Sequence, residues 1–309
     1  MERKKKILAV VGPTASGKTA LAVKLAKKYD GEIVSADSMQ IYKGMDIASA
    51  KPTEDEKEGI PHHLMGFLEP TEEFSVSDYV KLASDTIDQI IVRGNLPIVC
   101  GGSGLYIRSL LNNISFSDEE RNDELRAELN ERYINEGGEV LLKELAEFDP
   151  ESAARLDPSN SKRIVRAIEI YHTTGITMTE QIARSRLVPS PYDVIAIGLT
   201  FSDRAKLYER INDRVDRMME AGLLEETERF YSDKKSITAS AAIGYKELKP
   251  YLEGRMSLEA AVEKLKMETR RYAKRQLTWF RRDEYIKWIE VDTTDDLMAA
   301  AEGIIRMEG

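Results

Sequence analysis

Short runs of apolar residues alternate with helical patterns along most of the chain. The runs occupy residues 7–11, 32–36, 97–100, 194–200 and 286–291. Each has the length and composition of a strand that is buried on both faces of a sheet. Between the runs, apolar positions recur three and four residues apart, for example over 20–26 and 106–111. This alternation predicts an α/β fold with a parallel sheet flanked by helices.

One interval in this pattern is much longer than the others. Between the third and fourth predicted strands, only helical patterns occur, over 119–133, over 138–147, and from Asp157-Pro158 to Thr174-Gly175. We therefore expect a core domain formed by residues 1–115 and 193–309, with an all-helical insertion domain over 116–192. Long insertions beside an active site commonly act as lids or binding modules.

A glycine-rich segment joins the first predicted strand to the first predicted helix. It reads Gly12-Pro13-Thr14-Ala15-Ser16-Gly17-Lys18-Thr19 and fits G-x-x-x-x-G-K-[ST]. In this context backbone N–H groups at a positive helix end cradle two linked phosphates, Lys18 adds a charge, and the Thr19 hydroxyl can hold Mg²⁺. A glycine turn without a ligand is the competing interpretation. The agreement of loop and flanks predicts a P-loop NTPase-like core that binds a polyphosphate.

Two further segments follow predicted strands, where open α/β sheets bind ligands. Asp37 follows the second strand, where a carboxylate can bind a metal or accept a proton, although an Asp-Ser pair is also typical of a turn. The third strand runs into Gly101-Gly102-Ser103-Gly104, where P-loop ATPases often carry an acidic metal ligand. The missing acid disfavours ATP hydrolysis, and Ser103 can hydrogen-bond a substrate base.

The charge of the chain is unevenly distributed. The net charge is −9, which argues against a protein coated by nucleic acid, yet residues 264–282 contain eight basic residues and one acidic residue. Such a patch indicates either a docked polyanion or a solvated helix face. Tyr272, Trp279 and Phe280 lie within it and can stack on bases or belong to the core.

Two more groups of basic residues recur at helical spacing. The first consists of Lys162, Arg163 and Arg166, with Ile164 and Val165 on the opposite face. The second consists of Arg210, Arg214 and Arg217. The first group can contact phosphates or form a solvated face, whereas Asp213 and Asp216 can simply pair with the arginines of the second group.

Composition excludes several other kinds of protein. The single cysteine, Cys100, rules out an internal disulfide and a cysteine zinc site. His62 and His63 are adjacent and lack a third ligand, so packing or hydrogen bonding is expected of them rather than metal binding. No apolar stretch approaches the ~20 residues of a membrane span, and residues 1–6 do not resemble a signal peptide. We expect a cytoplasmic protein.

Several of these segments occur together in a characteristic order. They are residues 12–19, 35–40, 62–64, 101–106, 160–169, 214–218, 242–247 and 272–281. In this order the chain resembles the bacterial tRNA dimethylallyltransferases, also called tRNA isopentenyltransferases, over nearly its whole length. The chain departs from the family pattern in two features. Ser103 stands where threonine is more usual, and the zinc finger of eukaryotic relatives is absent.

The resemblance implies an activity. A dimethylallyl group would pass from dimethylallyl diphosphate to the exocyclic amino nitrogen of the adenine immediately 3′ of the anticodon, in tRNAs that read codons beginning with U. The phosphate loop would then hold a prenyl diphosphate rather than ATP, although such loops are often described as nucleotide-binding or ATP-binding.

The resemblance also implies a role for individual residues. Asp37 matches the general base, Lys18, Thr19 and Arg214 match groups on the departing diphosphate, and Mg²⁺, held at Thr19, offsets the same charge. The positions that match tRNA-binding stretches are Asp37, Ser38, Met39, Gln40, Ser103, Ser161, Lys162, Arg163, Ile164, Val165, Arg166, Ala241, Ala242, Ile243, Gly244, Tyr245, Lys246, Lys274, Arg275, Gln276, Leu277, Thr278, Trp279, Phe280 and Arg281. The adenine would leave its stack to reach the site, and the insertion domain would clamp the anticodon loop of tRNA.

Two other functions stay open at this point. A nucleoside or nucleotide kinase would share the phosphate loop and the parallel sheet, and would transfer phosphate from ATP. A nucleotide-gated RNA-binding switch without chemistry would bind RNA tightly even after Asp37→Ala. In each case we expect a monomer with no membrane contact.

Overall fold

The computed structural model describes residues 4–114, 122–185, 187–232, 237–240 and 242–308. The chain divides into two compact units, which are treated separately below. The first comprises Met1–Leu111 and Pro191–Gly309, and the second comprises Asn112–Ser190.

The first unit is built on a six-stranded sheet. Its strands are β1 (Lys5–Val11), β2 (Gly31–Ala36), β3 (His62–His63), β4 (Leu96–Gly101), β5 (Tyr192–Thr200) and β6 (Ile286–Glu290), in the spatial order β3-β2-β4-β1-β5-β6. All neighbouring strands are parallel, and β1 lies between β4 and β5. The five predicted strands and the P-loop NTPase-like α/β fold are confirmed. The short edge strand β3 was not predicted.

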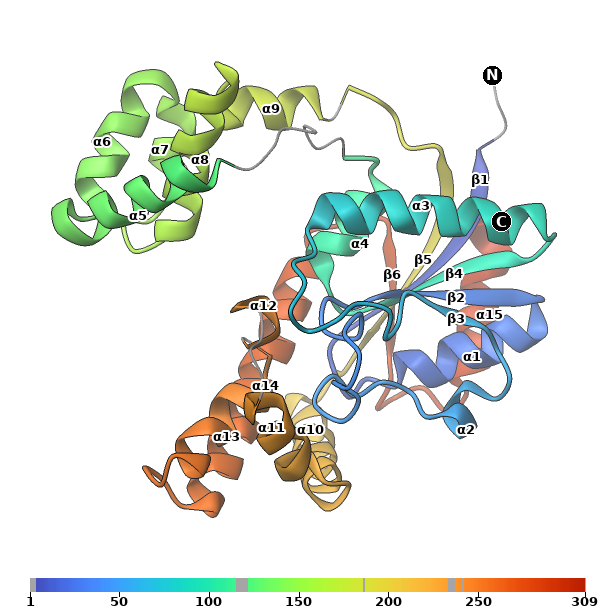
Figure 1. The fold of residues 1–309 in the computed structure, drawn as a ribbon. Helices are drawn as coiled ribbons and strands as arrows, with labels where there is room; N and C mark the ends of the chain where they lie inside the picture. Colours follow the sequence, from blue (N-terminus) through green and yellow to red (C-terminus); the bar gives the residue numbers. More distant parts are fainter. Residues whose placement is uncertain (1–3, 115–121, 186, 233–236, 241, 309) are drawn as a thin grey trace. The chain divides into compact units, whose positions relative to one another are not determined.

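Helices pack on both faces of this sheet (Figure 1). The helices of the first unit are α1 (Lys18–Lys28), α2 (Glu54–Lys57), α3 (Val76–Val92), α4 (Gly104–Leu111), α10 (Arg204–Glu220), α11 (Leu223–Ser232), α12 (Ile237–Ser240), α13 (Tyr245–Leu252), α14 (Leu258–Phe280) and α15 (Leu297–Glu308). Helices α3 and α4 cover one face, and α1 and α15 cover the other. Alternate side chains of each strand therefore enter two separate apolar layers.

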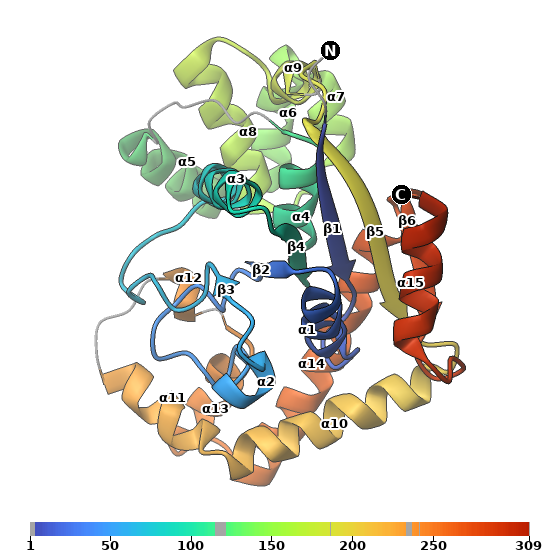
Figure 2. The ribbon, with the colours of Figure 1, turned by 90° about the vertical axis from the view of Figure 1, so that its right-hand side faces the viewer.

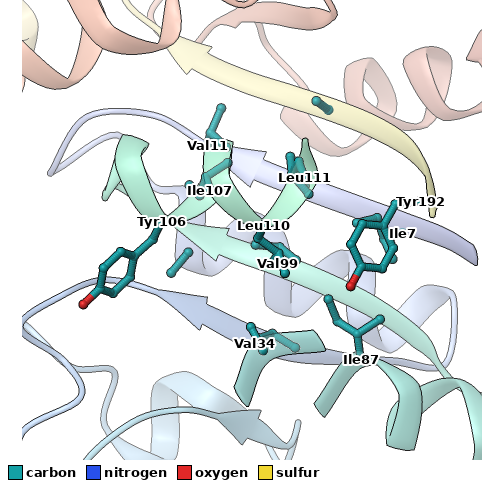
Figure 3. Packing of buried hydrophobic residues seen from close by; sticks show 14 of the residues in the cluster. Ile7, Val11, Val34, Ile87, Val99, Tyr106, Ile107, Leu110, Leu111 and Tyr192 are labelled. Carbon is teal, nitrogen blue, oxygen red and sulfur yellow. The ribbon is translucent and has the colours of Figure 1, made fainter. Parts of the chain in front are cut away.

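The layer under α3 and α4 is drawn in Figure 3. Ile7 and Val11 of β1 and Val99 of β4 meet Ile87 of α3 and Leu110 of α4 there, and all five are at most 2% exposed. The burial of apolar side chains such as these supplies most of the stability of such a core. Figure 2 shows α10, α11 and α13 beyond the carboxyl ends of β1 and β5, the edge at which the phosphate loop begins.

The second unit contains only helices in its described part. They are α5 (Asp123–Glu136), α6 (Gly138–Phe148), α7 (Pro150–Arg155), α8 (Ser161–Thr174) and α9 (Met178–Arg184). Its core gathers Leu129, Leu141, Leu145, Ile164 and Ile168. The boundary between α5 and α6 falls at Gly137, whose φ of 88° suits glycine.

Two helix boundaries in this unit differ from the prediction, and a third falls on residues outside the described ranges. The predicted start at Glu119 lies outside the described residues, and α5 continues to Glu136. The predicted start at Asp157 is wrong. The Asp157 carboxylate instead accepts hydrogen bonds from the backbone N–H (2.9 Å) and hydroxyl (2.6 Å) of Ser159, so these residues form a turn before α8.

Candidate active site

The glycine-rich segment forms the turn between β1 and α1. Gly17, with φ 88°, is the N-cap of α1, and no side chain caps this helix end. The first turn of α1 also lacks acidic residues. Its N–H groups are therefore left for an anion, which the helix dipole also attracts.

A cavity of about 330 Å³ lies against this turn and is formed wholly within the first unit. Among the described residues, its lining carries four Lys or Arg side chains but a single carboxylate, Asp37. The cations are Lys18, Arg214, Lys246 and Arg275. An anionic ligand fits this balance of charge. The apolar part of the lining includes Ile33, Met39, Met65, Val215, Met218, Ile243 and Leu265.

Lys18 and Arg214 approach the cavity from different helices. Burial lowers the pKa of Lys18, as does the nearby Arg214 guanidinium. Burial also lowers the pKa of Arg214, while Asp37 raises it. In the described part of the chain, Arg214 makes no ion pair. Two neighbouring cations without a full counter-charge favour a ligand with more than one negative charge.

Asp37 lies where β2 ends. Its Oδ1 accepts the N–H of Met39 at 2.9 Å, so the turn expected of an Asp-Ser pair is present. The same residue lines the cavity, so the turn and the placement beside the phosphate loop coexist. No hydrogen bond to Oδ2 occurs within the described residues, and this oxygen is left for a ligand.

The glycines after β4 allow close packing between neighbouring segments. A Cβ on Gly101 would lie 2.1 Å from the Ala36 carbonyl oxygen of β2. Next to it, the Ser103 Oγ accepts the N–H of Ser38 at 3.0 Å. Ser103 does not itself line the cavity, but it fastens the turn that carries Asp37. Its contact with a substrate base stays a prediction.

The segment after Asp37 is held by long-range hydrogen bonds. The Gln40 amide donates to the carbonyls of Ser49 (3.3 Å) and Ala50 (3.2 Å), both of which line the cavity. Glu226 of α11 accepts three backbone N–H groups from residues 46–48. Glu226 was missed from the sequence, because a lone glutamate in a charged helix gives no signal.

His62 of β3 also lines the cavity. Its Nδ1 lies 2.9 Å from the Ile60 carbonyl, and burial lowers its pKa. Its Nε2 is buried and has no hydrogen bond within the described residues. Across those residues no group of three or more His, Cys, Asp or Glu side chains is arranged to hold a metal ion.

Helix α14 carries the basic patch predicted from the sequence. Lys274, Arg275, Thr278 and Arg281 are exposed along it, whereas Gln276 and Phe280 are buried, and Leu277 and Trp279 are half-buried. Only Arg275 and Gln276 of residues 274–281 line the cavity, where Tyr272 joins them. Phe280 packs in the core, so its side chain is not available for stacking.

The neighbouring segment 242–246 lies at the start of α13. Ala242, Ile243 and Lys246 line the cavity, while Gly244 and Tyr245 are buried. Ala241 lies outside the described residues.

The basic groups on α10 and α8 differ in their partners. On α10, Asp216 pairs with Lys266 at 2.7 Å, and Arg210 donates to the Ala15 carbonyl at 2.9 Å. The alternative pairing of the α10 arginines with Asp213 and Asp216 does not occur among the described ion pairs. Within the second unit, Lys162 and Arg163 are exposed on α8, beside the half-buried Ser161.

The apolar face of α8 points inward as predicted. Ile164 and Val165 are 0% and 2% exposed in the core of the second unit, so their side chains do not reach the surface. No helix in the described residues is long and apolar enough to cross a membrane.

In a comparison with known proteins, the chain matches two family models. A model described as IPP transferase matches residues 40–283, and one described as isopentenyl transferase matches residues 5–65. The chain is 50% identical over 292 residues to a tRNA dimethylallyltransferase from Acetivibrio thermocellus, an alignment that covers 94% of this chain and 93% of the relative.

Solved structures give the same result. A full-length tRNA isopentenylpyrophosphate transferase from Bacillus halodurans has a TM-score of 0.71 at 41% identity, covering 99% of this chain and 95% of that one. A eukaryotic dimethylallyltransferase, captured acting on tRNA, has a TM-score of 0.83 at 30% identity, covering 97% of this chain and 78% of that one.

Proposed function

This chain belongs to the IPP transferase family, the tRNA dimethylallyltransferases, and we propose that the cavity at its phosphate loop is where it prenylates tRNA. The donor is dimethylallyl diphosphate. The acceptor is the exocyclic amino nitrogen of the adenine immediately 3′ of the anticodon, in tRNAs that read codons beginning with U. The products are isopentenyladenosine in the tRNA and free diphosphate.

The observation that carries this proposal is the position of one carboxylate among several cations. Asp37 shares the cavity with Lys18, Arg214 and the two other cations of the lining, and part of the remaining lining is apolar. A diphosphate satisfies the cations and the open start of α1, and a short prenyl chain suits the apolar lining. A carboxylate beside these groups is suited to accept a proton rather than to bind phosphate.

The chemistry follows from this arrangement. The amino nitrogen of adenine forms a bond to C1 of the prenyl group, while the bond from C1 to the diphosphate oxygen breaks. The nitrogen loses one proton, which Asp37 accepts as general base. Lys18, Arg214 and Thr19 stabilise the negative charge that develops on the departing diphosphate.

Mg²⁺ is the proposed metal, and the residues present fit it. The cavity offers the Thr19 hydroxyl but no cluster of carboxylates among its described residues. Mg²⁺ commonly binds through few protein ligands, with phosphate oxygens and water completing its shell. Thr19 would hold the ion, which when bound would neutralise part of the charge of the diphosphate.

Binding of tRNA is assigned to two basic surfaces and to the rim of the cavity. The surfaces are the exposed residues of α14 around Lys274 and those of α8 around Lys162. The rim segments are residues 37–40 and 242–246, and the proposal also includes Ser103 and Ala241, the latter outside the described residues. The adenine must leave its stack to reach Asp37, as enzymes that modify bases generally require.

The test is label transfer from dimethylallyl diphosphate to unmodified tRNA, with Mg²⁺ and without ATP. Label on the adenine beside the anticodon is the expected result. Phosphate transfer from ATP to a nucleoside, with no label on tRNA, would instead identify a kinase. Tight RNA binding with neither product, unchanged in Asp37→Ala, would identify a binding protein without chemistry.

A further inference from the structure

Gln276 of α14 joins two segments that are far apart in the sequence. Its Oε1 accepts the N–H of Thr14 in the phosphate loop at 2.9 Å. Its Nε2 donates to the carbonyl of Gly102, in the turn after β4, at 3.0 Å. The residue is 5% exposed, so this amide is buried in the first unit, where it lies at the wall of the cavity.

The environment of the amide fits this one orientation. A buried amide must find partners for its polar atoms, and a flipped amide would set its NH₂ group against the N–H of Thr14. Gly102 leaves room for the contact, since a Cβ there would lie 2.1 Å from the Gln276 Nε2. The glycine that precedes Ser103 thus serves contact with α14.

A second side chain holds the next residue of the phosphate loop. Arg210 of α10 donates to the Ala15 carbonyl at 2.9 Å, and Ala15 has a φ of 63°, which is unfavourable for alanine. Tertiary contacts must maintain such a conformation. Helices α10 and α14 therefore fix the loop at consecutive residues.

We propose that Gln276 is a positioning residue for the diphosphate loop, holding Thr14 in register with the turn that carries Ser103. Ser103 in turn accepts a hydrogen bond from the N–H of Ser38. The phosphate loop and the turn that carries Asp37 are therefore positioned relative to each other through Gln276 and Ser103. The inference rests on the proposed function of the loop as the diphosphate site. It assigns Gln276 to the donor side of the reaction, although its neighbours Lys274 and Arg275 are assigned to tRNA.

Two substitutions distinguish the contributions of the two hydrogen bonds that the amide makes. Gln276→Met removes both hydrogen bonds at similar volume. Gln276→Glu keeps an acceptor for Thr14, but an ionised carboxylate faces the Gly102 carbonyl with no proton to donate. Protonation restores that donor, so the defect of Gln276→Glu should shrink as the pH falls.

The measurements are the Kd of inorganic diphosphate by calorimetry, the KM for dimethylallyl diphosphate and the Kd of tRNA. In Gln276→Met we expect the first two to rise about tenfold, while the Kd of tRNA changes less than twofold. The activity of Gln276→Glu relative to wild type should increase as the pH falls from 8 to 6. The exposed Gln89→Glu on α3 is the matched control and should follow wild type throughout.

Two results would overturn the proposal. One is an unchanged Kd for diphosphate in Gln276→Met, and the other is a ratio of Gln276→Glu to wild-type activity that is flat across pH. If Gln276→Met does not fold, the proposal is tested on Gln276→Glu instead, by the calorimetric Kd of diphosphate and by the pH dependence of its activity. Wild-type protein that binds diphosphate but does not prenylate tRNA would contradict the proposed function, and calorimetry on the variants would still test Gln276.

Discussion

Tyr245 donates a hydrogen bond of 2.8 Å to the carboxylate of Glu226, and both side chains are buried. Burial, and next the Glu226 charge, raise the pKa of the Tyr245 hydroxyl, so it is protonated and acts as a donor. The same carboxylate accepts the N–H groups of Asp46 (2.9 Å), Ile47 (2.8 Å) and Ala48 (2.9 Å). One charge on α11 thereby fixes a loop that reaches the cavity at Ala48.

Removing this carboxylate should destabilise the first unit. Glu226→Ala leaves the hydroxyl and three N–H groups without their acceptor, and we expect a loss of about 3 kcal/mol in the free energy of unfolding by urea. Tyr245→Phe removes one bond and should cost about 1.5 kcal/mol. Glu228→Gln, at an exposed position of α11, is the control. Equal stabilities for Glu226→Ala and the control would contradict this account.

The role of Asp37 is tested most cleanly by Asp37→Asn. Asparagine keeps an oxygen for the N–H of Met39, and so preserves the turn, but it does not accept a proton. We expect kcat to fall by about 10²–10⁴-fold, the usual contribution of a general base, with the Kd of tRNA within twofold of wild type. Asp37→Ala should also abolish transfer while sparing tRNA affinity. A near-normal rate in either variant would remove Asp37 as the base.

The fold was largely predictable because its strands are continuous apolar runs. A strand buried on both faces, such as β1, reads directly from composition. Strand β3 was not predicted because it has only two residues, both histidine. It is a strand because it pairs with Ile33 and Val34 of β2. The start of α8 was misplaced because Asp157-Pro158 also suits a turn, and the hydrogen bonds of Ser159 select the turn.

The placement of residues at the cavity was predictable where those residues follow strand ends. Lys18 and Asp37 are local to motifs or to the carboxyl ends of β1 and β2. Gln276 and Glu226 act across the fold, on partners 262 and up to 180 residues away, and such pairings leave no pattern in one sequence. Helical periodicity did separate the buried Ile164 from its exposed neighbours on α8.

On α8, the basic residues should contribute unequally to tRNA binding. Arg166 pairs at 3.2 Å with the buried Glu169, which also receives Arg126 at 2.7 Å, whereas Lys162 and Arg163 have no ion pair within the described residues. We expect the double variant Lys162→Ala, Arg163→Ala to weaken tRNA binding about tenfold. Arg166→Ala should instead lower stability with little effect on affinity. The reverse ranking in a filter-binding assay would contradict this assignment.

On α14, Lys274 and Arg275 are predicted to contact phosphates. Removing two such contacts should reduce the slope of log Kd against log salt by about 1.5, because each contact releases counterions. The measurement is tRNA binding from low to moderate salt for the double alanine variant. Lys287→Ala, which removes a lysine of β6 paired with Glu308, is the control. An unchanged slope would mean that these residues form a solvated helix face and do not contact phosphates.

A buried carboxylate at the other end of β2 predicts how stability depends on pH. Glu32, whose side chain is 5% exposed, receives two hydrogen bonds from Arg93 (2.9 and 2.7 Å), one from Asn95 (2.7 Å) and a contact from His63 (2.6 Å). The bonds from Arg93, and then those from Asn95 and His63, outweigh burial and lower the pKa of Glu32 to about 2.

Because the pKa of Glu32 is lower in the folded chain than in the unfolded chain, the ionised form stabilises the fold. This contribution is complete above the unfolded value near 4.5 and is lost as the pH falls through about 2. We expect Glu32→Gln to cost about 2–3 kcal/mol at pH 7 and pH 6, less at pH 3, and almost nothing below pH 2. Urea unfolding of both proteins at each pH gives the difference. Glu58→Gln, whose exposed carboxylate pairs with Lys27, should show little effect at any pH. A difference for Glu32→Gln that stays constant down to pH 2 would mean that hydrogen bonding to Arg93 does not depend on the charge of the carboxylate.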